Sequence, residues 1–330
     1  MTDFASERYD RMKYRRCGRS GLMLPEISLG FWQSLGKGGN EDLCRRCAYY
    51  AFDHGVTHFD LANNYGPPPG NSELVLGNIL RDMPRDELVV STKAGYFMWP
   101  GPYGDGGGKK YLIASLDQSL RRLGLDYVDI YYHHRPDDQT PIEETMAALD
   151  LVVKQGKALY AGVSNYPGAT LRQACDVIAR HDWAPITIHQ PRINMLQPQG
   201  IGDVLPAADE LGVGAIAFSP LAQGRLTEKY LNGLPPDSRW GQAGERGIQW
   251  YENETKAGTW DKVSRLAAIA RARGQTMAQL ALAWLLDDRR ITSALVGVSR
   301  VEQLQEALGA VQSPPLSAEE KAKISTILGV

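Results

Sequence analysis

The feature that most constrains the fold of this chain is an unbroken alternation of short apolar runs with amphipathic helical stretches. The apolar runs lack the strict two-residue alternation of half-exposed strands, which is typical of strands in a parallel sheet covered by helices. The runs predict strands at 26–32, 56–62, 87–94, 127–134, 158–165, 186–190, 214–220 and 293–299. The amphipathic stretches predict helices near 41–54, 72–81, 110–123, 142–155, 168–180, 201–211, 261–286 (as two helices) and 301–311.

Eight strand–helix units in a chain of 330 residues favour a closed (β/α)8 barrel, a TIM barrel, over an open doubly wound sheet. The open sheet would need a glycine-rich phosphate loop. The stretch GDGGGKK at 104–110 departs from G-x-x-x-x-G-K-[ST], because Tyr103 stands at the first glycine and Lys110 at the last position. The stretch GKGGNE at 36–41 ends in Glu41 where G-x-G-x-x-G requires glycine. We interpret both stretches as flexible loops and predict an α/β fold of the TIM-barrel class.

Three segments fall outside the repeat, and we expect them to belong to one domain that spans residues 1–330. Residues 12–25 predict a small hairpin that turns at 19–21 and plugs the floor of the barrel. Residues 221–260 are too long for an ordinary connection and are rich in Gly, Pro, Trp and charge, and loops of that length usually cover a functional site. Residues 312–330 add a further helix at the C-terminal end.

The composition is that of an ordinary globular protein, with 43% hydrophobic and 22% charged residues. A net charge of -2 provides no overall field that would attract nucleic acid. No stretch approaches the roughly 18 uninterrupted apolar residues of a membrane-spanning helix, and residues 1–16 lack the apolar segment of a secretory signal. We therefore expect a cytoplasmic protein with no nucleic-acid or membrane partner.

Cysteine usage points to no disulfide framework and no metal site. Cys44 and Cys47 form a C-x-x-C, but the motif lies inside the predicted helix at 41–54. A zinc or redox role would want a second pair of cysteines or histidines nearby, or a turn before a helix. We interpret both cysteines as small residues on a helix face.

Polar side chains end six successive predicted strands. The carboxyl ends of the strands of a TIM barrel face one mouth, where the chemistry of such barrels takes place. A rim that served only the structure would not need these residue types together. In chain order the residues are Asp60 (followed by Tyr65), Lys93, His133 and His134, Ser164 and Asn165, Gln190, and Ser219.

The types of these residues suggest a reaction. A free tyrosine has a pKa near 10, too high for an efficient acid or base at neutral pH. An ammonium group beside Tyr65 would lower that pKa, and a carboxylate beside the ammonium group would keep it charged. Lys93 and Asp60 supply these two groups, and an imidazole across the site would orient a carbonyl oxygen. The set is suited to protonating an oxyanion as it forms at a carbonyl carbon.

Six motifs, in order and at matching spacing, resemble the aldo-keto reductase superfamily. They are FDLANNYG, STKAGY, VDIYYHHRPD, GVSNY, IHQ and FSPLAQGRLTEKY. The stretches NNYGPPPGNSE and SLGFW look most like the branch that holds the potassium-channel β-subunits and the bacterial L-glyceraldehyde 3-phosphate reductases. The resemblance covers roughly residues 12–311.

The resemblance implies a catalytic tetrad of Asp60, Tyr65, Lys93 and His134. Tyr65 would be the general acid that protonates the carbonyl oxygen while hydride arrives from a nicotinamide. His133 would point away from the site, into the wall or core of the barrel.

The resemblance also implies a cofactor site, expected to hold NADPH. Two departures bear on the choice between NADPH and NADH: Gln303 replaces an arginine found in many members, and Ala307 replaces a common asparagine. Arg300 is a further cation that would bear on this choice. The expected contacts are Ser164, Asn165 and Gln190 to the carboxamide, Phe218 under the nicotinamide, Ser219, Pro220, Leu221, Gln223 and Gly224 along the pyrophosphate, Lys229 and Arg239 to the phosphates, and Gly297, Ser299, Gln303 and Glu306 to the adenosine.

The expected substrate is a small aldehyde or ketone. Its pocket would be walled by Trp32, Tyr65, His134 and the loop from Tyr96 to Tyr103, which contains Trp99. A triose phosphate would need a cation at the mouth, and Arg135 is the nearest candidate. The sequence leaves the oligomeric state open, a homo-oligomer included.

Two other functions remain as alternatives. The first is a cofactor-binding regulatory subunit that senses redox state and contacts a partner protein. The second is a hydrolytic metal site that uses the histidines of the barrel, since His58 and Asp60 form an H-x-D on one strand. The metal signal is weak, because the carboxylate that such a site requires at the eighth strand is missing. We expect no metal.

Overall fold

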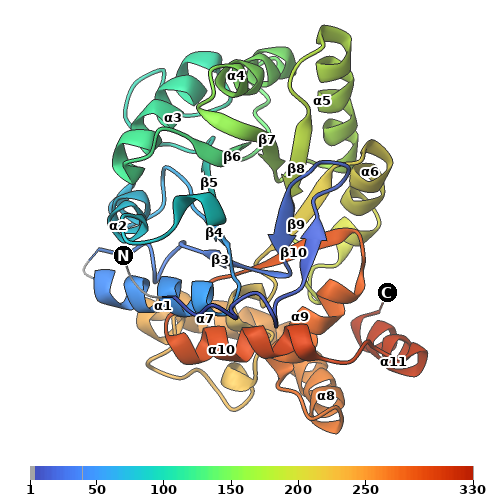
Figure 1. Cartoon of the computed structure of the whole chain (residues 1–330). Helices are drawn as coiled ribbons and strands as arrows, with labels where there is room; N and C mark the ends of the chain where they lie inside the picture. Colours follow the sequence, from blue (N-terminus) through green and yellow to red (C-terminus); the bar gives the residue numbers. More distant parts are fainter. Residues whose placement is uncertain (1–3, 39, 330) are drawn as a thin grey trace.

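The computed structural model describes residues 4–38 and 40–329, and within them a closed barrel of eight parallel strands is surrounded by helices (Figure 1). The predicted TIM-barrel class is thereby confirmed. The strands follow one another around the barrel in chain order, and the last pairs with the first. They are β3 (Ile27–Gly30), β4 (His58–Asp60), β5 (Val89–Ala94), β6 (Val128–His133), β7 (Ala158–Ser164), β8 (Ile186–Gln190), β9 (Gly214–Phe218) and β10 (Ile291–Val296).

The helices that follow the strands form the outer ring seen in Figure 1. Several end where a residue adopts the left-handed conformation, as at Gly124 and Gly212, which stops the helix and turns the chain toward the next strand. The helices of the ring are α1 (Glu41–Asp53), α2 (Asn71–Leu80), α3 (Lys109–Leu123), α4 (Ile142–Lys154), α5 (Gly168–His181), α6 (Val204–Leu211), α9 (Met277–Asp287) and α10 (Val301–Gly309). No helix in the described part of the chain is long and apolar enough to cross a membrane.

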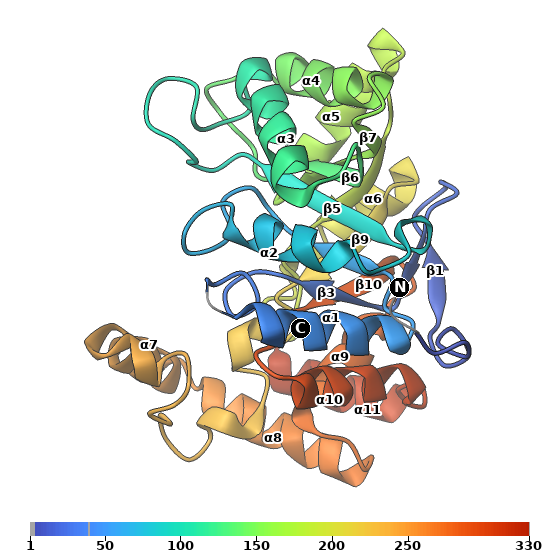
Figure 2. The same ribbon diagram turned by 60° about the vertical axis from the view of Figure 1, so that its left-hand side comes forward.

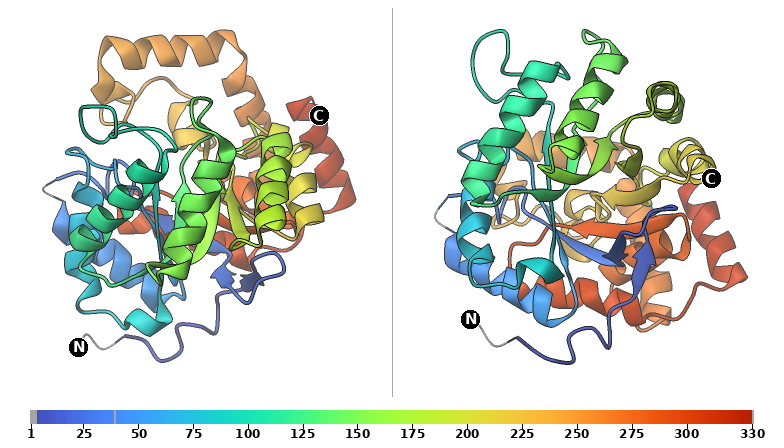
Figure 3. Two further views of the ribbon diagram at one scale, coloured as in Figure 1. Left: turned by 90° about the horizontal axis from the view of Figure 1, so that it is seen from above. Right: turned by 45° about the horizontal axis from the view of Figure 1, so that its top comes forward.

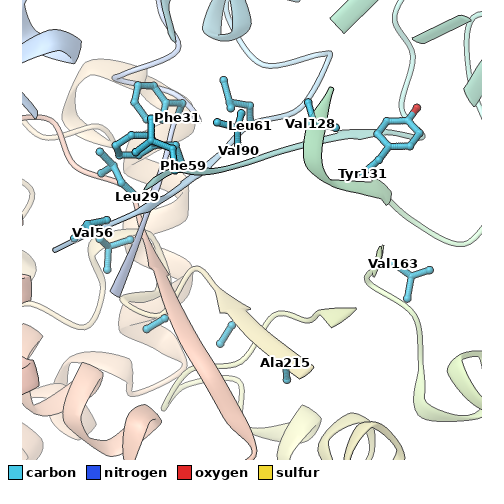
Figure 4. Close-up of a cluster of buried hydrophobic side chains, with 14 of the residues drawn as sticks. Leu29, Phe31, Val56, Phe59, Leu61, Val90, Val128, Tyr131, Val163 and Ala215 are labelled. Carbon is cyan, nitrogen blue, oxygen red and sulfur yellow. The ribbon is translucent and has the colours of Figure 1, made fainter. Parts of the chain in front are cut away.

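The main hydrophobic core lies between the barrel wall and this ring. Figure 4 shows side chains from several strands gathered in it, Leu29 and Phe59 among them. The rings of Phe31 and Phe59 meet edge to face, with centroids 5.9 Å apart. Each fully buried side chain of this size contributes roughly 1.5–3 kcal/mol, so the wall is a rigid support for the groups at its rim.

A hairpin closes the amino-terminal end of the barrel. Strands β1 (Tyr14–Arg16) and β2 (Met23–Pro25) pair antiparallel. Leu24, together with the turn residues beside it, packs against the side chains that fill the barrel interior, such as Ile188. Gly18 adopts a positive φ of 55°, and a Cβ there would lie 2.1 Å from a backbone carbonyl oxygen, so only glycine fits this turn.

The opposite end of the barrel carries the segment 221–260, whose conformation the periodicity left open. It contains short 3₁₀ turns and the helix α7 (Glu245–Lys256), and it leads into α8 (Thr259–Ala272). Figures 2 and 3 show α7 beyond the end of the barrel that lies opposite the hairpin. The rings of Tyr230 and Trp240 stack with centroids 5.1 Å apart. Trp250 on α7 joins this aromatic cluster, with its ring centroid 6.0 Å from that of Trp240.

Two further regions complete the C-terminal part of the described chain. The stretch predicted at 261–286 is indeed two helices, α8 and α9, separated by Gly274 at a φ of 69°. The chain ends in α11 (Ala318–Leu328), which begins with a capping box at Ser317 and packs on α8 through Ile324.

Candidate active site

A buried ion pair forms the base of the site at the carboxyl ends of β4 and β5. The ammonium group of Lys93 contacts the carboxylate of Asp60, and both side chains are excluded from solvent. Lys93 Nζ also donates to the carbonyl oxygen of Leu61 at 2.6 Å. Asp60 Oδ1 accepts hydrogen bonds from Ser91 Oγ at 2.7 Å and from Gln190 Nε2 at 3.1 Å. Every polar group of the pair therefore has a partner, as a buried charge requires.

The phenol ring of Tyr65 lies above this pair. Lys93 Nζ is 5.1 Å from the centroid of the Tyr65 ring, and the ring of His134 is 5.9 Å away, edge to face. Tyr65 stands in the loop after β4, which turns at once into a proline run. A Cβ on Gly66 would lie 1.9 Å from the carbonyl oxygen of Pro68, so the chain fits only glycine at this turn. The structure thus brings the four tetrad residues expected from the sequence together.

The protonation states of these groups follow from their burial. Burial raises the pKa of Tyr65 well above 10, and the nearby Asp60 carboxylate acts in the same direction. This direction is opposite to the one expected from Lys93 alone. The reason is that the burial of Tyr65 outweighs the effect of Lys93, whose charge is already paired with Asp60. Burial, together with the charge of Lys93, also holds the pKa of His134 well below 6.5. At neutral pH Tyr65 is a protonated phenol and His134 a neutral imidazole.

Amide side chains line the same rim on the far side of His134. Asn165 Nδ2 donates to the carbonyl oxygen of His134 at 3.0 Å and to Ser164 Oγ at 3.1 Å. Ser164 Oγ donates in turn to the carbonyl oxygen of Gln190 at 2.8 Å. Asn165 adopts a φ of 60°, an uncommon conformation for a residue other than glycine that clusters at ligand-binding sites.

The loop after β9 also contains residues other than glycine with a positive φ. Ser219, Ala222 and Gln223 have φ values of 52°, 48° and 59°. Gly224 follows at 94°. Such residues persist only where the surroundings hold them, and they are found at ligand clamps. The neighbouring expected contacts differ in exposure: Pro220 is buried, whereas Phe218 and Leu221 are partly exposed.

Asn194 is a residue of this region that the sequence-based prediction missed. Its Nδ2 donates to the carbonyl oxygen of Ser219 at 3.1 Å, and its Oδ1 accepts from the backbone N–H of Leu196 at 3.0 Å. The side chain is buried and holds the strained loop in place. The one available signal was a polar residue four positions after the end of β8, and that signal is weak.

Three cations converge beside this loop. The pKa of Lys229 is lowered by burial and further by the charges of Arg300 and Arg239. Like charges placed together in this way fit a bound anion, since phosphate oxygens would relieve their repulsion. The guanidinium of Arg239 also lies 5.6 Å from the ring centroid of Trp32, which ties the long segment to the loop after β3.

The expected adenosine end is an open depression next to these cations. It is lined by Arg300, Gln303 and Glu306, with Thr276 and Gln279 from the start of α9. Gln303 Oε1 accepts from the backbone N–H of Ser299 at 2.8 Å. Gly297 is exposed just before it, at the end of β10. The residues expected at this end are therefore neighbours in space as well as in sequence.

Of the two tryptophans expected to contact substrate, Trp32 lies near Tyr65, whereas Trp99 packs on another residue. Trp32 is 41% exposed, and its ring centroid lies 6.4 Å from that of Tyr65. Trp99 instead packs on Tyr111, at 5.2 Å between centroids. Tyr96, at the start of the loop expected to wall the pocket, contacts His134 edge to face at 4.7 Å.

Arg135 lies at the outer edge of this group. Its guanidinium is 4.8 Å from the ring centroid of Tyr96. It donates to the carbonyl oxygen of Gly95 at 2.8 Å and to Asp105 at 3.0 Å. A half-exposed guanidinium in a single ion pair at a pocket rim is able to exchange its partner for another anion.

Comparison of the sequence with known proteins identifies the family of the chain. The sequence profile described as "Aldo/keto reductase family" matches residues 26–328. This chain belongs to the aldo/keto reductase family. The family expected from the motifs is thereby confirmed, and membership supports carbonyl reduction as the reaction type of this aldo-keto reductase.

Individual relatives lie on the expected branch. This aldo-keto reductase is 50% identical over 326 residues to the L-glyceraldehyde 3-phosphate reductase of Escherichia coli O157:H7. The match covers 96% of this chain and 93% of the relative. The protein of the same description from Escherichia coli strain K12 is 49% identical over 326 residues, with the same coverage. A probable voltage-gated potassium channel subunit beta of Arabidopsis thaliana is 35% identical over 313 residues, covering 92% of this chain and 93% of the relative.

The remaining histidines of this aldo-keto reductase are held by other groups. His133 Nδ1 lies 2.7 Å from the hydroxyl oxygen of Tyr166, and His189 Nε2 accepts from the backbone N–H of Tyr166 at 3.2 Å. Among the described residues, no group of three His, Cys, Asp or Glu side chains is arranged to hold a metal ion. His58, the histidine of the H-x-D, is hydrogen-bonded to Ser28 and Ser91.

Proposed function

We propose that this protein reduces small aldehydes or ketones to alcohols with NADPH, and that a triose phosphate such as L-glyceraldehyde 3-phosphate is among its substrates. The observation that carries the proposal is the position of Tyr65: its ring lies 5.1 Å from Lys93 Nζ, which is paired with Asp60, and 5.9 Å from the ring of His134. The relatives described as L-glyceraldehyde 3-phosphate reductases support the choice of substrate.

The chain's own groups would perform the proton transfer. A carbonyl oxygen would lie between the Tyr65 hydroxyl and the His134 ring, which would orient it by a hydrogen bond without adding charge. Tyr65 would give up its proton as negative charge develops on that oxygen, and the ammonium group of Lys93 would stabilise the phenolate left behind. Asp60 would keep Lys93 charged. NADPH, when bound, would supply the hydride to the carbonyl carbon.

The residues present fit such a cofactor. Asn165 and Gln190 supply amide groups at the rim beside the tetrad, and the strained loop after β9 supports the adjoining wall. The charges of Lys229, Arg239 and Arg300 fit the phosphates, although Asp237 acts on Lys229 and Glu302 lies 3.9 Å from Arg300. The extra phosphate of NADPH would use these cations more fully than NADH. We therefore propose NADPH as the preferred cofactor despite Gln303.

The phosphate of a triose phosphate would bind at Arg135, in place of Asp105. Trp32 and Tyr96 would flank the short carbon chain. Arg135→Met should then raise KM for L-glyceraldehyde 3-phosphate about tenfold or more and leave KM for glyceraldehyde unchanged, because charged hydrogen bonds to phosphate are worth about 1.5–3 kcal/mol. Arg172→Met is the matched control, because it breaks the exposed ion pair between Arg172 on α5 and Glu210 on α6.

A panel of aldehydes and ketones tests the proposal as a whole. Loss of NADPH absorbance would be followed for each compound with purified protein. Turnover with triose phosphate above that with uncharged aldehydes supports the proposal, and absence of turnover with every compound would sink it.

A regulatory subunit is the second candidate, favoured by the 35% identity to a probable potassium channel subunit beta. Such a protein would bind NADPH tightly and turn over little or no aldehyde. The intact tetrad favours the enzyme, because a sensor of bound cofactor needs no protonated Tyr65 facing a neutral His134.

A further inference from the structure

A chain of buried hydrogen bonds runs through the barrel interior to the active site. Ser293 Oγ on β10 lies 2.7 Å from Ser28 Oγ on β3. Ser28 Oγ lies 2.9 Å from His58 Nδ1, and His58 Nε2 lies 2.9 Å from Ser91 Oγ. Ser91 Oγ donates to Asp60 Oδ1 at 2.7 Å. The chain joins four adjacent strands and ends on the carboxylate that holds Lys93.

The charge of Asp60 fixes the direction of every bond in this chain. An ionised carboxylate only accepts, so the Ser91 hydroxyl must donate to it. Ser91 Oγ must then accept from His58, which places the proton of the neutral imidazole on Nε2. His58 Nδ1 must accept from Ser28, and Ser28 Oγ must accept from Ser293. All donors therefore point toward Asp60, and bonds aligned in this way strengthen one another.

His58 differs from the other buried histidines in the described part of the chain. Both of its ring nitrogens are hydrogen-bonded. One ring nitrogen each of His133, His134 and His189 is enclosed without a partner. Burial lowers the pKa of His58 to about 4, so the ring is neutral in the pH range where it would act. A neutral ring with a defined tautomer is a rigid link between two strands.

We propose that His58 is a positioning residue for the proposed reduction: through Ser91 it fixes the Asp60 carboxylate, and through Asp60 it fixes Lys93 beneath Tyr65. The inference rests on the function proposed above. Asp60 Oδ1 accepts hydrogen bonds from Ser91 and Gln190, and Oδ2 contacts the ammonium group of Lys93. Without the N–H of His58, the Ser91 hydroxyl no longer accepts a hydrogen bond that holds it in place, and it is free to turn away from Asp60. The H-x-D of β4 is thus a link to the catalytic carboxylate and not a metal motif.

The tautomer of His58 is a first test that needs no turnover. Nitrogen NMR of protein labelled at histidine should show His58 neutral, with its proton on Nε2, from pH 6 to pH 8. A proton on Nδ1, or a charged ring, would overturn the chain as described. This measurement does not depend on the substrate, so it separates a failure of the chain from a failure of the proposed function.

Kinetic variants test the positioning itself. His58→Phe should lower kcat about tenfold, as expected for one lost buried hydrogen bond, with KM for the aldehyde and Kd for NADPH unchanged. His58→Gln keeps an N–H where Nε2 lies and should restore kcat to within about threefold of wild type. Because Ser91 and His58 act through one bond, Ser91→Ala should add little to His58→Phe.

Tyr131→Phe is the matched control, since it removes a buried hydrogen bond to Leu112 on the outside of the barrel wall. It should lower stability and leave kcat unchanged. An unchanged kcat in His58→Phe, or full additivity with Ser91→Ala, would overturn the positioning role. Wild-type protein that reduces no aldehyde would instead refute the proposed function, and the positioning role with it.

Discussion

Replacement of Lys93 by methionine measures how strongly the buried ion pair supports the fold. The side chains of Lys93 and Asp60 have exposed fractions of 0% and 1%. The variant keeps most of the side-chain volume but leaves the carboxylate with only Ser91 and Gln190 as donors. A buried charge that loses its partner costs about 3–5 kcal/mol, and the two remaining donors place the expected loss near the lower end, about 3 kcal/mol.

Urea unfolding followed by circular dichroism would measure this loss. With a slope of about 3 kcal/mol per M for a chain of this size, the midpoint should fall by about 1 M. The double variant Lys93→Met/Asp60→Asn also removes the stranded charge, and its midpoint should lie above that of the single variant. A midpoint for Lys93→Met within about 0.2 M of wild type, or a double variant with the lowest midpoint of all, would refute this account of the pair.

Three further results are expected. Burial lowers the pKa values of His58, His133 and His189 from 6.5 to about 4, 4 and 3. Below pH 6.5 the unfolded chain therefore binds protons that the folded chain does not, and Tm should fall as pH drops toward 5. A Tm that is flat over this range would contradict the burial of these rings. Arg239→Ala should weaken NADPH binding about tenfold in a fluorescence titration and NADH binding much less, and an equal loss for both would argue against a role at the extra phosphate. Gly18→Ala should lower Tm but leave kcat unchanged at 25 °C, because the clash lies on the floor of the barrel; a loss of kcat without a loss of Tm would contradict that placement.

The barrel was predictable because its strands and ring helices bury apolar faces with clear periods. Helix α7 was not, since it lies outside the strand–helix repeat and Gly247 is its only buried residue in the structure as described, so no barrel strand or core fixes its place. The strand ends were located well for the same reason as the strands. Asp60 and Lys93 fall where a buried run gives way to a polar turn, and the pairing of β4 with β5 brings them together.

The sequence alone did not show how deeply each functional side chain is buried or which side chains lie next to it. The pKa of Tyr65 shifts in the direction opposite to the one expected from Lys93, because burial outweighs the effect of a neighbouring charge that is already paired. Trp99 and Tyr96 lie three residues apart in one loop, and only the fold decides which of the two faces His134. The hydrogen-bond chain through His58 to Asp60 includes serines from three other strands and has no local signature.

The central claim is that Tyr65 donates the proton in a carbonyl reduction, and Tyr65→Phe tests it most directly. Turnover of NADPH with an aldehyde substrate would be measured for wild type, for Tyr65→Phe and for Tyr131→Phe, together with Kd for NADPH. Tyr65→Phe should lower kcat by about 10²–10⁴-fold with Kd nearly unchanged, while Tyr131→Phe should keep its kcat. A Tyr65→Phe variant as active as wild type would contradict the claim.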